Sequence, residues 1–385
     1  MYSIIAYGAM IADKGRMQPY STALQRAIKE DSVVLDIGTG TGIFALLSCH
    51  YGARHVYAVE PDDTIQVARE LADANGFSGR ITFIQDLSTN ITLPEKANII
   101  VSDLRGALPA FMQHFPSIID ARKRHLAPDG ILIPCRDMLR AALVEAPDLY
   151  RRFTAPWNRD EFGINMQPTM QWITNTLWSD KGNKDDYERI VGEVVTWSTV
   201  DYYTVEKPNI SGDLKWRIDQ HATAHGIRVW FDSILFEDIG FSNAPDQPPL
   251  IYGNLFFPWP GPVTLDAGDT VSVSLRANLV GNDYTWSWNT AVFNKNNPGK
   301  NKAEFKQSTF YGMSLSPDQL GKRASGFKPV LNQDGMIDLQ VMQMMEQGLL
   351  LEDIARQIST SYPERFPGPQ QALSYVADLS VKYSK

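Results

Sequence analysis

The chain has only two cysteines among its 385 residues, Cys49 and Cys135, too few for a disulfide framework or a cysteine-rich zinc site. It also lacks an apolar run of membrane-spanning length, and no signal-type apolar block follows a basic region at its N-terminus. A formal net charge of −8 gives no general attraction for nucleic acid. We therefore expect a cytoplasmic protein with no nucleic-acid or membrane partner and no bound metal.

A glycine-rich turn follows the first strongly apolar segment. Val-Val-Leu-Asp-Ile at residues 33–37 precedes GTGTG at residues 38–42, and an apolar stretch with helical spacing comes next. This order predicts a strand, a tight turn and a helix whose N-terminal N–H groups face a ligand. The glycine spacing differs from the GxGxxG of dinucleotide-binding turns. The turn residues that we assign to the cofactor site are Gly38, Thr39, Gly40 and Gly42.

Acidic residues stand at or near the ends of three successive predicted strands. These are Asp36, Glu60 and Asp86, each in or directly after a short apolar β-type segment. Because parallel strands end at one edge of a sheet, we expect the three carboxylates to face the same ligand. Glu60 suits the two hydroxyls of a ribose, and Asp86 suits the amino group of an adenine.

These carboxylates favour a cationic ligand that contains an amino acid and an adenosine. S-adenosylmethionine is such a ligand, whereas a pyrophosphate is not. We therefore predict S-adenosylmethionine as the cofactor, and the alternatives are a nicotinamide site or an α/β core without this ligand. Leu87 and Ser102, at the ends of the third and fourth predicted strands, complete the predicted cofactor site.

The fourth predicted strand, residues 97–103, leads into the predicted acceptor site. Ligands of such sheets bind beyond the carboxyl ends of the strands, so Ser102, Asp103 and Arg105 should face the reacting methyl group. We predict that Asp103 orients the acceptor or takes its proton, and that Arg105 anchors an acidic group on it. The alternative is a local salt bridge between Asp103 and Arg105.

A candidate helix precedes the first strand and contains Asp13, Arg16 and Tyr20 at three- and four-residue intervals. On such a helix Arg16 is placed to reach the carboxylate of the methyl donor. The alternative, which spacing alone slightly favours, is a solvent-exposed amphipathic helix in which Asp13 pairs with Arg16.

The residue pattern that predicts secondary structure changes twice along the chain. Up to residue 134 strands and helices alternate, which predicts a Rossmann-like domain over residues 1–134 with a parallel sheet. Short β-type segments separated by turns then predict a β-barrel domain for substrate binding and dimerisation over residues 135–320. Helical spacing in the last part predicts a small helical domain over residues 327–385.

The chain resembles the protein arginine methyltransferase family across roughly residues 7 to 315. The matching residues are Met10 to Asp13 with Arg16 and Tyr20, residues 33–43, Gly52-Ala53-Arg54, Glu60, Leu126 to Gly130 with Ile133-Pro134, and His225-Gly226-Ile227 with Trp230 to Asp232. By this resemblance, Arg16 holds the donor carboxylate, Asp36 and Gly38 lie against its methionine part, and Glu60 binds the ribose. The resemblance also implies a head-to-tail homodimer formed by an arm of the barrel, which we place between Asn165 and Ser179.

The acceptor loop departs from that family. Two glutamates clamp a guanidinium in the family, but here Asp103 stands at the first position and Met112 or Gln113 at the second. The family's threonine-histidine-tryptophan loop falls on residues 250–252, Leu-Ile-Tyr, without the histidine. Two carboxylates are the usual means of orienting a planar cation, so arginine is in doubt as the substrate.

The tail has a second resemblance, to the helical part of the PqqD-like domains that bind precursor peptides, over residues 346–358 and 366–368. A structural helical appendage is the alternative. We predict an S-adenosylmethionine-dependent methyltransferase with a peptide or protein acceptor that the tail helps to capture. Two alternatives stay open: a small-molecule N- or O-methyltransferase of biosynthesis, and a donor-binding pseudoenzyme that serves as a scaffold.

Overall fold

The computed structural model describes residues 2–158, 163–180, 186–295 and 297–384. The chain forms two compact units, Met1–Met313 and Ser314–Lys385. None of the described helices combines the length and the apolar character that crossing a membrane requires.

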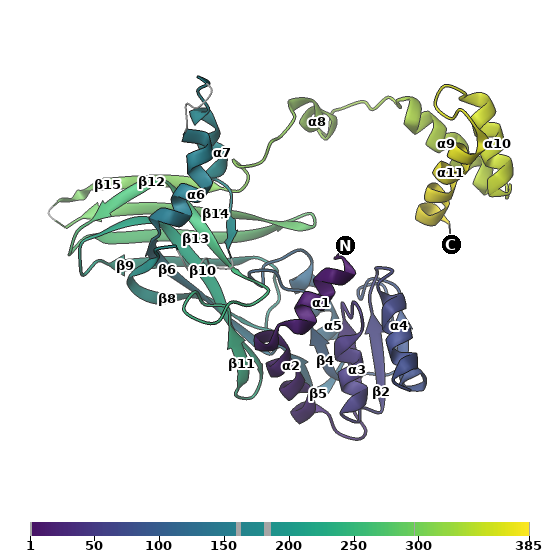
Figure 1. Ribbon diagram of the computed structural model, residues 1–385, viewed down its shortest axis with the longest axis horizontal. Coiled ribbons are helices and arrows are strands. Elements are labelled where there is room, and N and C mark those ends of the chain that lie inside the picture. The colour runs from purple at the N-terminus through teal and green to yellow at the C-terminus, as the bar shows by residue number, and fades with distance from the viewer. Residues whose placement is uncertain (1, 159–162, 181–185, 296, 385) are drawn as a thin grey trace. The chain divides into compact units, whose positions relative to one another are not determined.

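The first unit begins with a parallel sheet flanked by helices (Figure 1). Its strands lie in the order β3-β2-β1-β4-β5. The strands are β1 (Val33–Ile37), β2 (His55–Val59), β3 (Ile81–Ile84), β4 (Ala97–Ser102) and β5 (Leu126–Ile133). The helices are α1 (Ile4–Ala12), α2 (Lys14–Ala27), α3 (Ile43–His50), α4 (Ile65–Ala74) and α5 (His114–Arg124).

Alternate residues of β1 face opposite sides of this sheet, as the period of two in a strand requires. Leu35 belongs to the same buried cluster as Phe115 of α5, whereas Val34 belongs to the cluster that contains Phe44 of α3. Because both faces are covered, the strand is apolar throughout except at Asp36. An acid inside so buried a strand needs a hydrogen-bond or charge partner.

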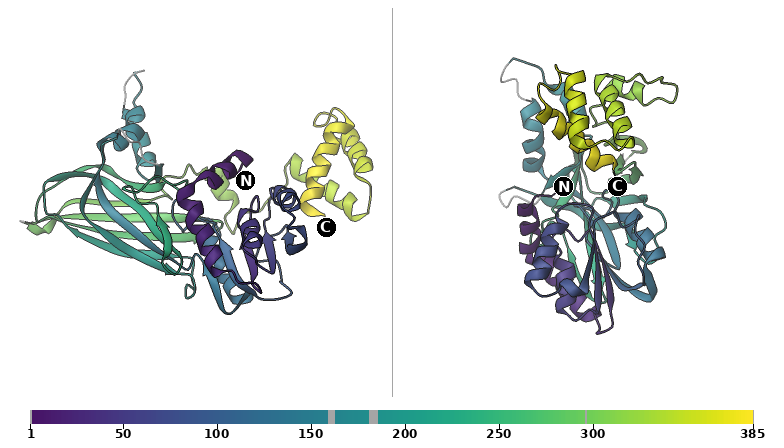
Figure 2. Two further views of the ribbon diagram at one scale, coloured as in Figure 1. Left: turned by 60° about the horizontal axis from the view of Figure 1, so that its bottom comes forward. Right: turned by 90° about the vertical axis from the view of Figure 1, so that its right-hand side faces the viewer.

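The second half of this unit consists of two antiparallel sheets within the described residues. One sheet has the order β7-β12-β10-β6-β8 with β11 beside β10, and the other has the order β15-β14-β13-β9. Their strands are β6 (Arg136–Glu145), β7 (Trp178–Asp180), β8 (Arg189–Asp201), β9 (Ile210–Arg217), β10 (Ala222–Phe236), β11 (Ile239–Ser242), β12 (Asn254–Leu265), β13 (Thr270–Val280), β14 (Asp283–Asn294) and β15 (Asn297–Ser308). Figure 2 shows these elongated strands beside the shorter parallel sheet.

Aromatic side chains fill the core of the antiparallel half. Trp216, Trp259 and Trp288 have no exposed surface, and Trp286 is 4% exposed. These four tryptophans are therefore core residues of the antiparallel half.

A short arm extends from the antiparallel half, formed by α6 (Pro147–Asn158) and α7 (Met170–Ile173) (Figure 1). Trp178, at the base of the arm, is buried in a cluster with Tyr150 and Phe256. Trp172 and Ile164 remain 42% and 62% exposed. The exposed apolar surface of the arm is therefore smaller than its sequence suggests.

The second unit contains α8 (Pro317–Lys322), α9 (Gln333–Glu346), α10 (Leu351–Ser361) and α11 (Pro369–Tyr383). The last three helices share their own apolar core, which includes Ile337, Val341, Met344, Ile354, Ile358 and Val376. The predicted fold class, a Rossmann-like half, a β-barrel half and a helical tail, is confirmed. The domain boundaries that we expect at residues 134, 320 and 327 stay predictions.

Candidate active site

The glycine turn between β1 and α3 lies against the end of β2. The N–H groups of Gly38 and Thr39 donate to the carbonyl oxygen of Val59 at 2.9 and 3.1 Å. Gly38, Gly40 and Gly42 have φ angles of 72, 53 and 87°, which other residues rarely adopt. The turn therefore keeps a backbone shape that depends on glycine and is fixed against the end of β2.

Two side chains close over this turn. A Cβ atom added to Gly40 would lie 2.4 Å from Cε1 of Tyr7, on α1. A Cβ atom added to Gly38 would lie 2.3 Å from Cδ2 of Leu104, in the loop after β4. Both positions therefore need glycine because of close approach as well as backbone angle.

The carboxylate of Asp36 is fully buried and only half satisfied. Its Oδ2 accepts hydrogen bonds from the Thr39 hydroxyl at 2.5 Å and from the Ala45 N–H at 3.0 Å. Its Oδ1 has no hydrogen-bond partner among the described residues. Burial raises the pKa of Asp36 to about 7, although the bonds from Thr39 and Ala45 act in the other direction. A cationic ligand group at Oδ1 would complete this site.

Glu60 follows β2 and lies beside the glycine turn. Its Oε2 accepts from the Gly40 N–H at 3.0 Å, and its Oε1 accepts from the Asp62 N–H at 3.1 Å. Burial raises the pKa of Glu60, while the two backbone hydrogen bonds lower it. The two N–H groups fix the carboxylate at the edge where β1 and β2 end together, with Ile37 paired to Val59.

Asp86 and Leu87 lie at the surface, in contrast to Asp36 and Glu60. Oδ1 of Asp86 accepts from the Leu87 N–H at 2.7 Å and from the side-chain amide of Asn90 at 2.8 Å. Leu87 is 54% exposed. Their assignment to the adenine end of the cofactor stays a prediction.

Asp13 separates α1 from α2 and does not belong to either helix. Its Oδ1 accepts from the backbone N–H of Arg16 at 3.2 Å, and its Oδ2 accepts from the N–H of Ile251 at 2.6 Å. Asp13 therefore caps α2 and links it to the loop before β12. The alternative of a solvent-exposed Asp13–Arg16 pair is wrong, because Arg16 is only 6% exposed and its side chain pairs with another residue.

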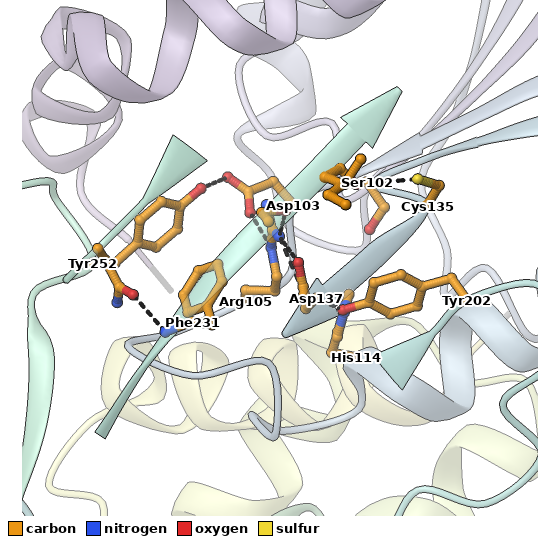
Figure 3. A network of polar contacts seen from close by, with 12 residues as sticks. Ser102, Asp103, Arg105, His114, Cys135, Asp137, Tyr202, Phe231 and Tyr252 are labelled. Atoms are coloured by element: carbon orange, nitrogen blue, oxygen red, sulfur yellow. Dashed lines mark hydrogen bonds and ion pairs between the residues drawn. The ribbon is translucent and has the colours of Figure 1, made fainter. Parts of the chain in front are cut away.

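That partner is Asp103, directly after β4 (Figure 3). Oδ2 of Asp103 accepts from Nε of Arg16 at 2.7 Å and from the hydroxyl of Tyr252 at 2.5 Å. Its Oδ1 accepts from Nε of Arg105 at 3.1 Å, so the local salt bridge is present. Burial alone would raise the pKa of Asp103, but Arg16 and Arg105 outweigh it and hold the pKa below its usual range. Such a stable anion is better suited to orienting a group than to removing a proton.

The guanidinium of Arg105 has no exposed surface. Its Nη1 donates to both carboxylate oxygens of Asp137 at 2.9 and 3.2 Å and to the Ser233 hydroxyl at 2.7 Å. Its Nη2 donates to the Tyr20 hydroxyl at 2.5 Å. Because these partners belong to β6, β10 and α2, Arg105 ties the parallel sheet to the antiparallel half.

Aromatic rings surround the same guanidinium. Its Cζ lies between 5.1 and 5.9 Å from the ring centroids of Tyr20, Phe231, Phe241 and Tyr252. This is the range of cation–π contacts, which are stronger in a desolvated site. We call the four rings together with Asp103 and Asp137 the arginine cage.

His114 and Tyr202 extend this network into the antiparallel half. The Tyr202 hydroxyl donates to Oδ2 of Asp137 at 2.5 Å and lies 3.0 Å from Nε2 of His114. Since the hydroxyl proton is used, Nε2 carries the proton that it donates to Tyr202. Burial, reinforced by the charge of Arg105, lowers the pKa of His114 to about 3.

We expect the neutral form of His114 to make the stability of the protein fall in acid. An unfolded histidine takes up a proton near pH 6.5, whereas the folded one resists protonation down to about pH 3. The full contribution is present above pH 6.5, and about 3 kcal/mol of it is lost by pH 4. Urea unfolding of the parent and His114→Gln between pH 4 and 7.5 measures it.

The stability of the parent must be compared with that of His114→Gln at each pH, because Asp36 changes stability with pH in the opposite direction. Its raised pKa of about 7 makes the folded state bind more protons than the unfolded state as the pH falls below 7. His50→Gln, at an exposed position of α3, is the control. Identical pH dependence of the parent and His114→Gln would contradict the assignment.

Sequence reasoning missed Asp137, Tyr202 and His114 as members of this network. His114 lies 23 residues before Asp137, and Tyr202 lies 65 residues after it. The three residues belong to no recognisable motif. Tyr252 could have been noticed in the sequence, because it lies in the loop at residues 250–252 that departs from the family pattern. Its contact with Asp103 could be known only from the folded structure.

The site fits the predicted donor. Asp36 and Ser102 both have a buried oxygen without a hydrogen-bond partner among the described residues, and Ile37 pairs with Ser102 at the strand ends. Unpaired polar atoms at one edge of a sheet suit a ligand that carries an amino group and a carboxylate. No group of three or more metal-binding side chains occurs in the part of the chain that the structure describes.

Comparisons with known proteins show similarity to methyltransferases. The model of the ribosomal protein L11 methyltransferase (PrmA) family matches residues 21–147. The chain is 32% identical over 248 residues to protein arginine N-methyltransferase 1 of Schizosaccharomyces pombe, which covers 61% of this chain and 71% of that protein. It is 30% identical over 233 residues to probable protein arginine N-methyltransferase 6 of Arabidopsis thaliana. That match covers 58% of this chain and about half, 52%, of the Arabidopsis protein.

A solved structure has a similar fold. It is the Trypanosoma brucei PRMT1 enzyme-prozyme heterotetrameric complex with AdoHcy, with a TM-score of 0.70 and 22% sequence identity. The similarity covers 78% of this chain and 96% of that chain. It extends over both the parallel-sheet half and the antiparallel half of the fold.

Proposed function

Because this chain belongs to the protein arginine N-methyltransferase family, we propose that it transfers a methyl group from S-adenosylmethionine to a peptide or protein acceptor. When bound, S-adenosylmethionine supplies a methyl carbon on a sulfonium, and the lone pair of the acceptor bonds to that carbon and displaces the sulfur. The observation that carries the proposal is the pair of unsatisfied buried oxygens on Asp36 and Ser102 beside the glycine turn.

The residues of this edge have distinct proposed roles. Asp36 holds the donor's amino group, Glu60 accepts from its ribose hydroxyls, and Arg16 binds its carboxylate. Arg16 also keeps Asp103 in place through the 2.7 Å contact. Methyl transfer is a displacement in line, so the main task of these residues is to align donor and acceptor.

The acceptor end supports a substrate other than arginine. Asp103 already accepts three hydrogen bonds, and Met112 or Gln113 stands where the family has its second glutamate. Gln113 donates to the carbonyl oxygen of Gly281 at 3.0 Å. A guanidinium would therefore meet one carboxylate that already accepts three hydrogen bonds, in place of a clamp of two free carboxylates.

A transfer assay tests the proposal. The full chain is incubated with methyl-labelled S-adenosylmethionine and a peptide pool, and mass spectrometry locates the methylated residues. We expect donor-dependent peptide methylation that disappears in Glu60→Ala. Donor binding without transfer to any peptide would favour the scaffold alternative, and transfer only to small molecules would favour a biosynthetic enzyme.

We propose a homodimer formed through the arm, as the family resemblance implies. The exposed Trp172 and Ile164 give the arm an apolar surface that association would cover. Light scattering at micromolar concentration should report twice the chain mass of 43.2 kDa. Trp172→Glu should shift the protein toward the monomer, whereas a monomeric parent protein would refute the proposal.

We also propose that the tail captures the peptide. Its helices have their own core, and residues 314–332 that precede α9 are mostly exposed, so truncation after Ala324 should leave the first unit intact. A tethered peptide would reach an effective concentration of about 1 mM near the donor. We expect weaker binding of the true substrate and unchanged S-adenosylhomocysteine affinity, both measured by calorimetry. Unchanged substrate binding would make the tail a structural appendage.

A further inference from the structure

The arginine cage has the features of a guanidinium-binding site, but the protein's own Arg105 fills it. Asp137 contributes two carboxylate oxygens to one side of this guanidinium, and Asp103 contributes one to the other. Aromatic rings cover it, and it has no exposed surface. No external guanidinium can enter the cage while Arg105 is there.

The charges of the network cancel. Arg16 and Arg105 carry two positive charges, and Asp103 and Asp137 carry two negative charges, all on side chains that are 7% exposed or less. The other polar partners, among them Tyr20, are neutral at pH 7 because burial raises the pKa of that hydroxyl far above its usual value. The Asp103 carboxylate contacts both arginines, so an additional cation next to it would meet a negative charge that Arg105 offsets even when Arg16 also binds the donor.

The hydroxyl of Tyr252 strengthens this effect. It donates to Oδ2 of Asp103 at 2.5 Å, and its ring stacks on Phe241 with a centroid distance of 5.6 Å and an angle of 4°. Phe231 packs against the same ring at 5.7 Å. Packing on these rings holds the hydroxyl on the carboxylate, so Asp103 cannot offer two free oxygens to an acceptor.

We propose that the acceptor of this methyltransferase carries no positive charge, and that Arg105 is the positioning residue that determines this by neutralising Asp103 from inside the protein. The inference rests on the function proposed above and specifies its substrate class. An uncharged nitrogen or an oxygen forms the bond to the methyl carbon, and sulfur keeps the electron pair of the broken bond. The proton that the acceptor loses passes to solvent.

Two peptides that differ at one side chain test this inference. One contains a central arginine and the other a central citrulline, which has nearly the same shape without the charge. Their binding to the full chain saturated with S-adenosylhomocysteine is compared by NMR titration or calorimetry. We expect the parent protein to bind the arginine peptide no more tightly than the citrulline peptide. A preference for arginine of tenfold or more would overturn the inference.

Charge-changing variants then test the role of Arg105. Arg105→Met leaves the network with one net negative charge and should shift the ratio of affinities toward arginine by about tenfold. Asp137→Asn leaves one net positive charge and should shift the ratio the other way. The double variant Arg105→Met/Asp137→Asn restores neutrality and should behave like the parent. A ratio that stays constant across folded variants would overturn the assignment to Arg105.

These measurements also distinguish a variant that fails to fold, or to bind the donor, from a failure of the inference. Arg105→Met leaves Asp137 without its charge partner and can unfold, and in that case Asp137→Asn and the double variant still decide the outcome. Circular dichroism establishes that each variant is folded, and S-adenosylhomocysteine titration establishes that its donor site is intact. Lack of donor binding by the parent protein would refute the proposed function itself, independently of the peptide ratio.

Discussion

Glu60→Ala should bind S-adenosylhomocysteine more than a hundredfold less tightly than the parent protein. A hydrogen bond to a charged group contributes about 1.5–3 kcal/mol, and the substitution removes the acceptor for two ribose hydroxyls. It also leaves the N–H groups of Gly40 and Asp62 without the oxygens that they now reach at 3.0 and 3.1 Å. The glycine turn therefore loses part of its support together with the ligand contacts. Isothermal titration calorimetry measures the change.

Two matched variants separate the causes of that loss. Glu60→Gln keeps the shape and one acceptor oxygen, so its affinity should lie between those of the parent and the alanine variant. Glu70→Ala removes an exposed glutamate of α4 and should leave affinity unchanged. If Glu60→Ala retains the parent affinity, the donor does not bind at the edge of β1 and β2.

Arg105→Met should lower the free energy of unfolding by about 3–5 kcal/mol, the usual cost of leaving one member of a buried ion pair without its partner. The side chains of Arg105 and Asp137 have no exposed surface, and they lie 2.9 Å apart at the closest oxygen. Because Arg105 also contacts α2 and β10, the substitution weakens the connection between the two halves of the first unit. Urea unfolding followed by circular dichroism measures the effect.

Arg140→Met is the control for this measurement. Arg140 pairs with Asp232 at 2.7 Å, but both side chains are more than a quarter exposed. Such a pair contributes about 0–1 kcal/mol, so the control should change stability by no more than that. Equal effects of the two substitutions would show that the arginine cage adds nothing specific to stability.

The sequence was sufficient to predict a donor edge. Asp36, the glycine turn and Glu60 lie within 25 residues, so their strand-turn-helix arrangement is local and depends on strand pairing that the apolar pattern specifies. The resemblance to the protein arginine methyltransferase family, now confirmed, rested on this stretch together with further matches between Met10 and Asp232. The absence of the second glutamate was also visible, because neither Met112 nor Gln113 is an acid.

The acceptor end depended on tertiary structure. Arg105 looked like a group available to a substrate, because a sequence cannot show that its guanidinium is enclosed by rings from α2, β10 and β11 and from residue 252. Asp137 lies 32 residues after Arg105, which it contacts. Tyr252 lies 149 residues after Asp103, which it contacts.

The order of residues over a short stretch thus determined where the donor is expected to bind. The positions of strand ends and of the turn's backbone N–H groups depend on residues that are close together in the sequence. Only the tertiary structure determines which charged side chains have a compensating partner. In a buried network each charge is compensated by whichever partner lies within a few ångströms, and for Asp103 those partners come from the N-terminal helix, the next turn and the antiparallel half.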